Sequence, residues 1–309
     1  AAAFPSHHYF KPDFVIVFDP ETKAGLISDL KYPREKVILS GYIASKTFRK
    51  LVEQMRLLDR KLLAVEIHKE TGLELDPMRK TILITGGAGG IIDTANKLLK
   101  RITDHQKNDP VFRDSHQFLV ITGQNQGFFK KLTKKRKRKE WSNIIPVPWV
   151  ARDIYLKLQL FSDFPILITI APATINELLE TNCGPFLIQH CRHGQEQANV
   201  DFTVRNKFGY YVPNSKNMLQ WIISGFSTKE KSEFGKAAAN YRNTRLELLK
   251  ELPPEISRAY QETVNPLRNT DKKRLSFEMD WNLISPKVLL SIFIMLIPSS
   301  MIFAYAQYY

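Results

Sequence analysis

The sequence predicts an α/β protein with a Rossmann-like, doubly wound parallel sheet and a carboxyl-terminal transmembrane helix. Short apolar runs alternate with longer helical patterns, and a glycine-rich segment separates one such run from a helix; both observations predict the sheet. An uncharged apolar run at residues 288–309 predicts the transmembrane helix. The 309 residues, 43% hydrophobic and 25% charged, are sufficient for a packed core, so global disorder is excluded.

The apolar runs are predicted to be buried parallel strands. They lie at residues 13–18, 81–85, 117–122, 144–148, 166–170 and 185–189. Every run except the first precedes a predicted helix, most clearly at residues 91–104, 152–160, 174–181 and 196–206. Because ligands of such sheets bind at the carboxyl ends of the strands, the loops that follow the strands are the candidate binding loops.

The remainder of the chain is predicted to be helical. A polar helical pattern covers residues 228–270 and either wraps the domain or leads to the membrane. We therefore expect a Rossmann-like domain at 1–227, a helical wrap and linker at 228–284 and a single transmembrane helix at 285–309. The apolar run is long enough to cross about 30 Å of hydrocarbon, and Lys287 and other basic residues precede it. A buried core helix is the alternative.

The charge of the chain predicts an anionic partner. The formal net charge is +14 and the isoelectric point is about 9.6, which suits nucleic acid, nucleotide phosphate or an acidic membrane surface. A dense basic run occupies residues 130–140; its context favours anionic lipid or an acidic subunit over nucleic acid. Cys183 and Cys191 lack zinc-site spacing and are predicted to be buried thiols in a reducing compartment; no metal site is expected.

The segment "TGGAGG", residues 85–90, follows a predicted strand and precedes a predicted helix. Glycines there let backbone N–H groups approach a phosphate, although a tight turn would also need them. Ile92 stands where a dinucleotide fingerprint requires glycine, the next strand ends without an acidic residue, and no Walker lysine is present. Nicotinamide enzymes and P-loop ATPases are therefore disfavoured.

Two further loops carry polar side chains. In "APATINELL", Thr174 and Glu177 have the spacing of a capping box, and Glu177 is also placed to accept hydrogen bonds from a ribose diol. In "GQEQAN", Gln195, Glu196 and Asn199 follow an apolar run. They either cap a helix or bind a ligand, and the pattern alone leaves both interpretations open.

Five motifs in order resemble the carboxyl-terminal half of one glycosyltransferase family. The motifs are "TILITGGAGG", "ITGQN", "PWVARD", "APATINELLE" and "GQEQANVDFTVRNKFGYYV". They are similar to those of plant monogalactosyldiacylglycerol synthase and bacterial MurG, within a resemblance that covers roughly residues 10–225. The family has two facing Rossmann-like domains, the glycosyltransferase B fold, and transfers a sugar from a nucleotide donor to a lipid-borne hydroxyl.

The resemblance implies a donor site and no cofactor, with a UDP-sugar as the substrate of an active enzyme. Gly86, Gly87, Ala88 and Gly89 would face the diphosphate, Val150 would meet the uracil, Thr174 would lie near the phosphates and Glu177 would hold the ribose. Gln195, Glu196 and Asn199 would bind the transferred sugar. The resemblance also points to a plastid or photosynthetic membrane.

Some positions depart from the family pattern. Ala171 and Ala173 replace two glycines beside the phosphates, and Thr169 stands where the galactolipid synthase has lysine. Few residues precede the glycine loop, so the acceptor domain and the catalytic residues are not identified. Three explanations stay open: an acceptor domain on a separate subunit, an acceptor domain outside the given sequence, or an inactive scaffold subunit of a larger membrane complex.

Overall fold

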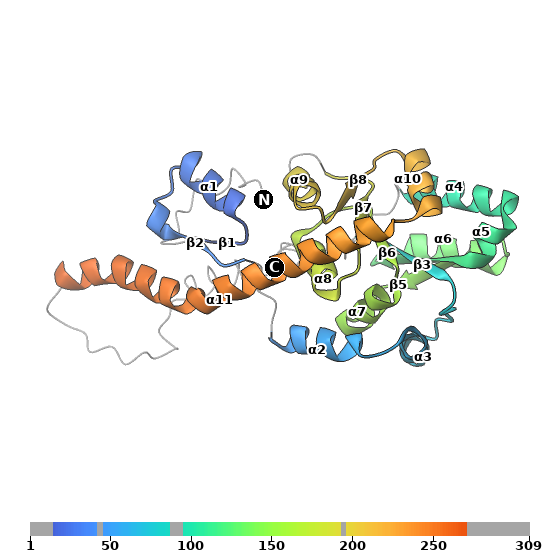
Figure 1. Ribbon diagram of the computed structural model, residues 1–309, viewed down its shortest axis with the longest axis horizontal. Helices are drawn as coiled ribbons and strands as arrows, with labels where there is room; N and C mark the ends of the chain where they lie inside the picture. Colours follow the sequence, from blue (N-terminus) through green and yellow to red (C-terminus); the bar gives the residue numbers. More distant parts are fainter. Residues whose placement is uncertain (1–14, 42–45, 87–94, 193–195, 271–309) are drawn as a thin grey trace. The chain divides into compact units, whose positions relative to one another are not determined.

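The computed structural model describes residues 15–41, 46–86, 95–192 and 196–270. The chain forms two compact units (Figure 1). The first is built on Ala44–Arg242, and the second combines residues 2–43 with 243–309. The predicted transmembrane helix lies outside the described residues, and within them no helix is both long and apolar enough to cross a membrane.

The first unit contains a six-stranded, wholly parallel sheet. Its strands, in spatial order, are β5 (Ile144–Pro148), β4 (His116–Gly123), β3 (Lys80–Thr85), β6 (Phe164–Leu167), β7 (Phe186–Ile188) and β8 (Gly209–Tyr211). The chain builds outward from β3 through β4 to β5, and then returns to place β6 on the other side of β3. The predicted doubly wound sheet is confirmed, with its topological switch point between β3 and β6.

Helices cover both faces of this sheet. Side chains that alternate along each strand separate the two cores: Ile82 and Ile84 of β3 join one, and Leu83 joins the other. The first face packs against α4 (Ala95–Asn108), α5 (Pro110–Ser115), α6 (Gln126–Lys137) and α10 (Ser215–Ser224). The second packs against α3 (Arg60–Thr71), α7 (Arg152–Phe161), α8 (Pro172–Thr181), α9 (Gln197–Arg205) and the start of α11 (Thr228–Thr270).

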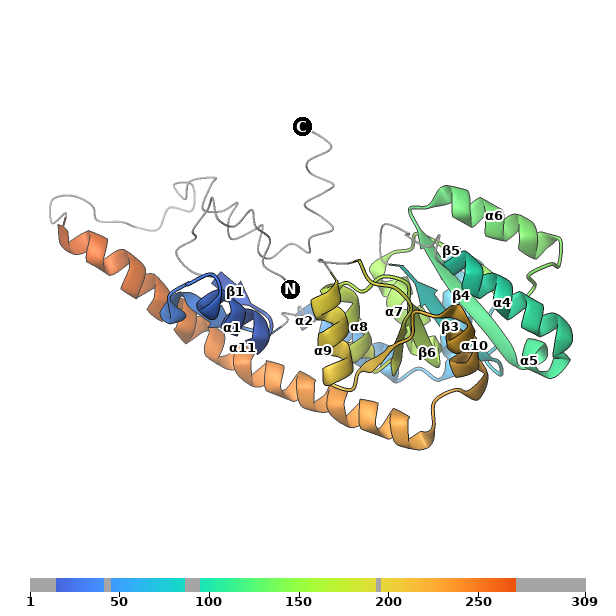
Figure 2. The ribbon, with the colours of Figure 1, turned by 90° about the horizontal axis from the view of Figure 1, so that it is seen from above.

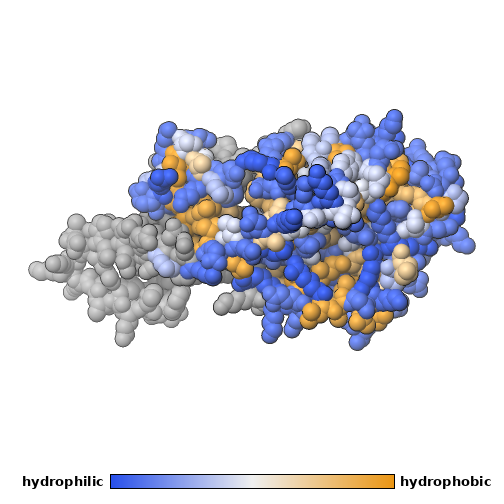
Figure 3. All heavy atoms as spheres, viewed as in Figure 1, coloured by the Kyte–Doolittle hydropathy of each residue, from blue (hydrophilic) through white to orange (hydrophobic). Residues whose placement is uncertain are grey.

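Several elements of the first unit had no sequence prediction. They are α2 (Lys46–Arg56), α3, α5, β8 and α10, whereas α6 is the helix expected after the run at 117–122. The predicted strand at 166–170 begins two residues earlier, at Phe164, and ends at Leu167. The face seen in Figure 3 is largely hydrophilic, with an apolar area near α2 and α3, where Leu57, Leu62 and Val65 are exposed.

The second unit has its own small core. Strands β1 (Val15–Val17) and β2 (Val37–Leu39) pair in parallel, connected through α1 (Pro20–Ser28) and the short 3-10 helix η2 (Arg34–Lys36). The helix that follows the first strand was not predicted; Asp19 caps it by accepting a 2.7 Å hydrogen bond from the Thr22 N–H. Gly41, at φ +63°, lies so close to Arg245 that a Cβ atom would approach its Cγ to 2.7 Å.

The long helix predicted at 228–270 is confirmed as α11. Phe234, near its amino end, packs edge-on against Phe186 of β7 and leaves no room for a side chain at Gly184. Arg242 donates a hydrogen bond to the Leu179 carbonyl at the end of α8. The amino-terminal part of α11 is therefore an integral part of the first unit. The two cysteines are free and buried, as predicted.

Candidate nucleotide-sugar site

The carboxyl ends of β3 and β6 meet at the switch point of the sheet. Gly86, the first residue after β3, is buried, and its carbonyl accepts a 2.9 Å hydrogen bond from the Thr169 hydroxyl. Thr169 follows β6 and is itself buried, so this bond ties the two loops together. Gly87, Ala88 and Gly89 lie outside the described residues. The structure thus fixes the base of the glycine loop beside the loop after β6.

The loop after β6 leads into α8. The helix begins at Pro172 with Ala171 at its N-cap, and no side chain caps it. Thr174 is therefore a buried residue inside the first turn, and the predicted capping box of Thr174 and Glu177 is wrong. Proline is favoured at the first helical position because its fixed φ suits a helix and its missing N–H costs nothing there. It moves the start of α8 upstream of Thr174.

Glu177 forms the principal ion pair of this edge. Its carboxylate lies 3.0 Å from the Arg152 guanidinium at the start of α7, and only 14% of the Glu177 side chain is exposed. Burial raises the pKa of Glu177 above its ordinary value, and the charge and hydrogen bond of Arg152 partly oppose that rise. The Arg152 guanidinium also lies over the Phe48 ring of α2 at 4.2 Å, which restricts its position.

Two residues near α7 border the same edge. Val150 is half-buried, packs against the core between the sheet and α7, and follows the exposed Trp149. Tyr155 is oriented with its hydroxyl 3.5 Å from the Thr85 hydroxyl at the end of β3. Its burial raises the pKa of Tyr155 to about 12, so the phenol is neutral at physiological pH.

The described residues of "GQEQAN", 196–199, form the start of α9. Glu196 occupies the N-cap position without capping the helix; its carboxylate instead accepts a 2.9 Å hydrogen bond from the Arg192 N–H in the preceding loop. Asn199 donates a 3.0 Å hydrogen bond to the Ile170 carbonyl, in the loop after β6. Gln195 lies outside the described residues. Neither described side chain makes the predicted helix cap, and both orient the loops around the edge.

The contacts therefore link five neighbouring segments of the first unit. Thr169 connects the loops after β3 and β6, Arg152 connects α7 to α8, and Asn199 connects α9 to the loop after β6. The ion pair of Arg152 with Glu177 was not predicted from the sequence, although Arg152 lies within the motif "PWVARD". The available signal was a basic residue at the first helical position after a predicted strand.

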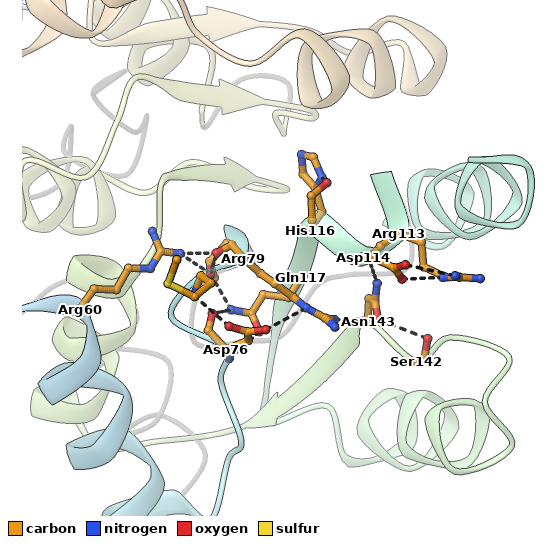
Figure 4. A network of polar contacts seen from close by, with 12 residues as sticks. Arg60, Asp76, Arg79, Arg113, Asp114, His116, Gln117, Ser142 and Asn143 are labelled. Atoms are coloured by element: carbon orange, nitrogen blue, oxygen red, sulfur yellow. Dashed lines mark hydrogen bonds and ion pairs between the residues drawn. The ribbon is translucent and has the colours of Figure 1, made fainter. Parts of the chain in front are cut away.

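A second polar region lies at the opposite, amino edge of the sheet, around a hollow of about 760 Å³. Figure 4 shows its network of side chains. Gln117 is buried and bonds to the backbone N–H and carbonyl of Asp76 and to the Thr81 hydroxyl. Arg60 donates to Asp163, to the Arg79 carbonyl and to the Thr81 hydroxyl. These bonds connect the starts of strands, and we assign no ligand here.

The parallel sheet and its switch-point site define a glycosyltransferase B type of α/β fold, as solved structures confirm. A glycosyltransferase from Rickettsia africae superimposes with a TM-score of 0.55 at 15% identity, covering 85% of this chain and 68% of that one. An alpha,alpha-trehalose 6-phosphate synthase from Burkholderia multivorans gives 0.51 at 8% identity, with coverages of 85% and 61%. At these identities the likeness concerns the fold.

Sequence comparison makes the relationship more specific. Monogalactosyldiacylglycerol synthase 2 of Arabidopsis thaliana is 28% identical over 167 residues, which is 53% of this chain and 33% of that protein. The synthase of Spinacia oleracea is 28% identical over 168 residues, with coverages of 53% and 30%. No family model matches the chain. The predicted resemblance to MurG and monogalactosyldiacylglycerol synthase-like glycosyltransferases is confirmed, and the chain spans about a third of the length of the curated relatives it matches.

Proposed function

We propose that this chain provides the donor-binding half of a glycosyltransferase that moves a sugar from a UDP-sugar to a membrane lipid. The principal support is the largely buried Glu177 carboxylate, held by Arg152 at the switch-point edge. A carboxylate in such a position accepts two hydrogen bonds from a ribose diol, and partial burial strengthens both. The similarity to galactolipid synthases supports the lipid as acceptor.

The remaining roles follow the course of a bound donor along this edge. The backbone of Gly86, Gly87, Ala88 and Gly89 would bind the diphosphate, and the positive end of α8, beside Thr174, would stabilise its charge. The Val150 backbone would meet the uracil. Gln195, Glu196 and Asn199 would bind the hydroxyls of the sugar. No catalytic residue is assigned, and the acceptor groove belongs to a part of the enzyme that the described residues do not include.

Isothermal calorimetry with UDP, UDP-glucose and UDP-galactose tests this proposal. Glu177→Ala should weaken UDP binding by about 1–3 kcal/mol, because charge-assisted hydrogen bonds to the ribose are lost. Glu53→Ala is the matched control, since Glu53 is an exposed carboxylate on α2. If the correctly folded, unmutated chain binds none of these nucleotides at millimolar concentration, the donor-site proposal fails.

A second function, an inactive scaffold subunit of a membrane complex, is favoured by one observation. The Glu177 carboxylate and the Asn199 amide, both proposed to contact the donor, already have partners within the chain, Arg152 and the Ile170 carbonyl. Such contacts stabilise the fold whether or not a donor binds. Absence of nucleotide binding, together with co-purification of hydrophobic subunits, would support the scaffold. Co-purification of an acceptor-domain polypeptide would support a divided enzyme.

We also propose that residues 285–309 anchor the chain in a membrane, with a plastid membrane as the candidate location. The support is the uncharged run that follows Lys287. Removing the residues from Ser285 onward should release the protein from membranes washed with carbonate at high salt. The salt is needed because it screens electrostatic attachment of the basic residues. Retention of the truncated chain would contradict a simple anchor.

A further inference from the structure

The basic run at residues 130–140 lies largely on α6, and its side chains are arranged in stripes. Phe128 and Leu132, one helical turn apart, are buried in the core and fix the orientation of the helix. Lys130, Lys134 and Lys137 follow the same spacing on another side and are all exposed. Lys131, Lys135 and Arg138 form the adjacent stripe. The packing of α6 therefore presents one fully exposed cationic stripe to solvent and, beside it, a second stripe in which Lys135 is half-buried.

Helix α6, which carries both stripes, lies at the outer margin of the first unit in Figure 2. Residues 130–139 include eight lysines and arginines. Within the described residues, the ion pair that reaches this run joins Arg138 to Glu140 at 3.9 Å, and both of those side chains are exposed. The cationic surface is thus almost uncompensated by the protein itself.

Helix stability does not account for so many cations. Basic residues in the last turn interact favourably with the helix dipole, but Lys130 and Lys131 lie before that turn. Like charges spaced by three or four residues repel each other and destabilise a helix. Lys130 repels Lys134, and Lys134 repels Lys137 and Arg138. A sequence selected for the stability of α6 would place carboxylates among these positions.

A hollow of about 370 Å³ lies along the same stripe. Its lining combines four cations with a half-buried aromatic ring and a hydroxyl, namely Lys130, Lys134, Lys137, Arg138, Phe129 and Thr133. Flexible cationic side chains around a shallow hollow suit a phosphate group, which accepts several charge-assisted hydrogen bonds at once. We propose that the outer face of α6 docks onto anionic phospholipid and that this hollow receives a headgroup phosphate.

The observations favour a lipid surface over nucleic acid. Single-stranded nucleic acid is bound in cationic grooves whose exposed aromatic rings stack on bases. Along residues 126–141, Phe128 and Trp141 are buried, Phe129 is half-buried, and Lys135 covers the Trp141 ring at 3.8 Å. The face is a single convex helix, which matches the planar array of charges on a bilayer. Juxtaposed cations of this kind are attracted to anionic leaflets in proportion to their number.

The test measures partition of the full chain onto lipid vesicles. The readout is the ratio of two affinities, one for vesicles of phosphatidylcholine with about 30% phosphatidylglycerol and one for vesicles of phosphatidylcholine alone. Phosphatidylglycerol gives the first kind of vesicle an anionic surface. An apolar anchor would insert into both kinds of vesicle, so the ratio isolates the electrostatic contribution. We expect a ratio well above one at low salt that falls steeply as salt is raised.

The substituted chain carries Lys130→Gln, Lys134→Gln and Lys137→Gln. We expect the ratio to fall by about 100-fold, because each of the three lysines near an anionic surface contributes roughly fivefold at low salt. The control carries Lys50→Gln, Lys61→Gln and Lys69→Gln, exposed positions on α2 and α3 with the same total change in charge. An equal fall in both would overturn the proposal by showing a general effect of net charge.

Two further measurements distinguish other sources of phosphate. Tighter binding of a single-stranded oligonucleotide than of anionic vesicles, lost in the α6 variant, would replace the lipid by nucleic acid. Elimination of vesicle binding by inorganic phosphate at constant ionic strength would indicate a site for the free anion. The α6 variant should bind UDP as the unmutated chain does, since no residue of the candidate donor site is changed. Failure of the docking surface and failure of the donor site are thereby separable.

Discussion

The two edges of the six-stranded sheet hold polar networks of different construction. At the amino edge, Gln117 is buried and all of its recorded hydrogen bonds go to residues that begin or precede neighbouring strands. At the carboxyl edge, Glu177 of α8 reaches the start of α7 and Asn199 of α9 reaches the loop after β6, and both side chains remain partly accessible. The first network connects the starts of the strands, whereas the second connects helices and loops at the switch point of the sheet.

The difference explains why the hollow of about 760 Å³ at the amino edge is not assigned as the ligand site. At the amino edge, the Gln117 amide already bonds to Asp76 and Thr81, and Arg60 already bonds to residues at the starts of strands (Figure 4). The carboxyl edge combines the switch point, a helix amino end and a buried carboxylate with a raised pKa. Replacements at the amino edge should therefore change stability, and replacements at the carboxyl edge should change binding.

The largest expected effect is at the amino edge. Gln117→Ala should lower the free energy of unfolding by about 2–3 kcal/mol, because the backbone N–H and carbonyl of Asp76 lose their partner at a partly buried position and the buried Thr81 hydroxyl loses one of its hydrogen bonds. Urea denaturation measures this loss. Gln124→Ala, at an exposed glutamine just after β4, should cost less than about 0.5 kcal/mol. A selective loss of UDP affinity in Gln117→Ala would break the distinction between the edges.

A smaller effect separates sugar recognition from loop structure at the carboxyl edge. Gln195→Ala and Glu196→Ala should each weaken binding of a UDP-sugar by about 1–2 kcal/mol and leave UDP binding unchanged, because the nucleotide contacts belong to other loops. Calorimetry with both ligands measures the difference. Gln197→Ala, at an exposed position on α9, is the control. Equal losses for UDP and the UDP-sugar, accompanied by lower stability, would assign the two residues a structural role.

The raised pKa of Glu177 predicts a pH dependence that sharpens the comparison further. The carboxylate must be ionised to accept the ribose hydroxyls, so UDP affinity should fall as the pH drops through that pKa, by up to about 1.4 kcal/mol per pH unit below it. The diphosphate of UDP also titrates. Measuring UDP affinity of Glu177→Gln over the same pH range separates the two effects, because this variant keeps the titration of UDP and removes that of residue 177.

The stability of the free protein should change in the opposite direction. A folded-state pKa above the unfolded value means that the native state binds the proton more tightly. The contribution of Glu177 to stability is therefore complete below the ordinary glutamate pKa and is lost as the pH rises through the raised one. Thermal denaturation of the unmutated and Glu177→Gln chains across that window measures it. The same pH trend in both chains would remove Glu177 as its cause.

The smallest effect concerns a single hydrogen bond. Asn199→Ala should reduce the free energy of unfolding by about 1 kcal/mol, because the Ile170 carbonyl loses its donor at a half-buried site. Asn217→Ala, at an exposed position on α10, is the matched control and should be close to neutral. A stability unchanged by Asn199→Ala, with a weakened affinity for the UDP-sugar, would show that the amide acts on the ligand alone.

Much of the sheet could be predicted from the sequence because most of its strands lie in continuous apolar runs. The strand expected at 144–148 is β5 itself, and the run at 117–122 lies within β4. Strands β2 and β8 were not predicted, whereas the equally short β1 and β7 lie within longer apolar runs that were predicted. The start of α8 was misplaced because Pro172 sets the first turn more strongly than the spacing of Thr174 and Glu177 favours a cap.

The candidate site was also predicted only in part. Motif order identified the loops after β3 and β6, and the structure places both at the switch point. The ion pair of Arg152 with Glu177 was not foreseen, because the two residues lie on different helices and their separation depends on how α7 and α8 pack. Asn199 was expected to face a ligand, and its amide also holds the Ile170 carbonyl.

The sequence by itself determined the alternation of strands and helices, the order of the family motifs and the spacing of the cations on α6. Each depends on neighbours along the chain, which periodicity and composition record directly. Only the tertiary structure decided the strand order, the partner of Glu177 and the separation of a structural amino edge from an accessible carboxyl edge. These depend on contacts between distant segments, whose geometry is set when both faces of the sheet are packed.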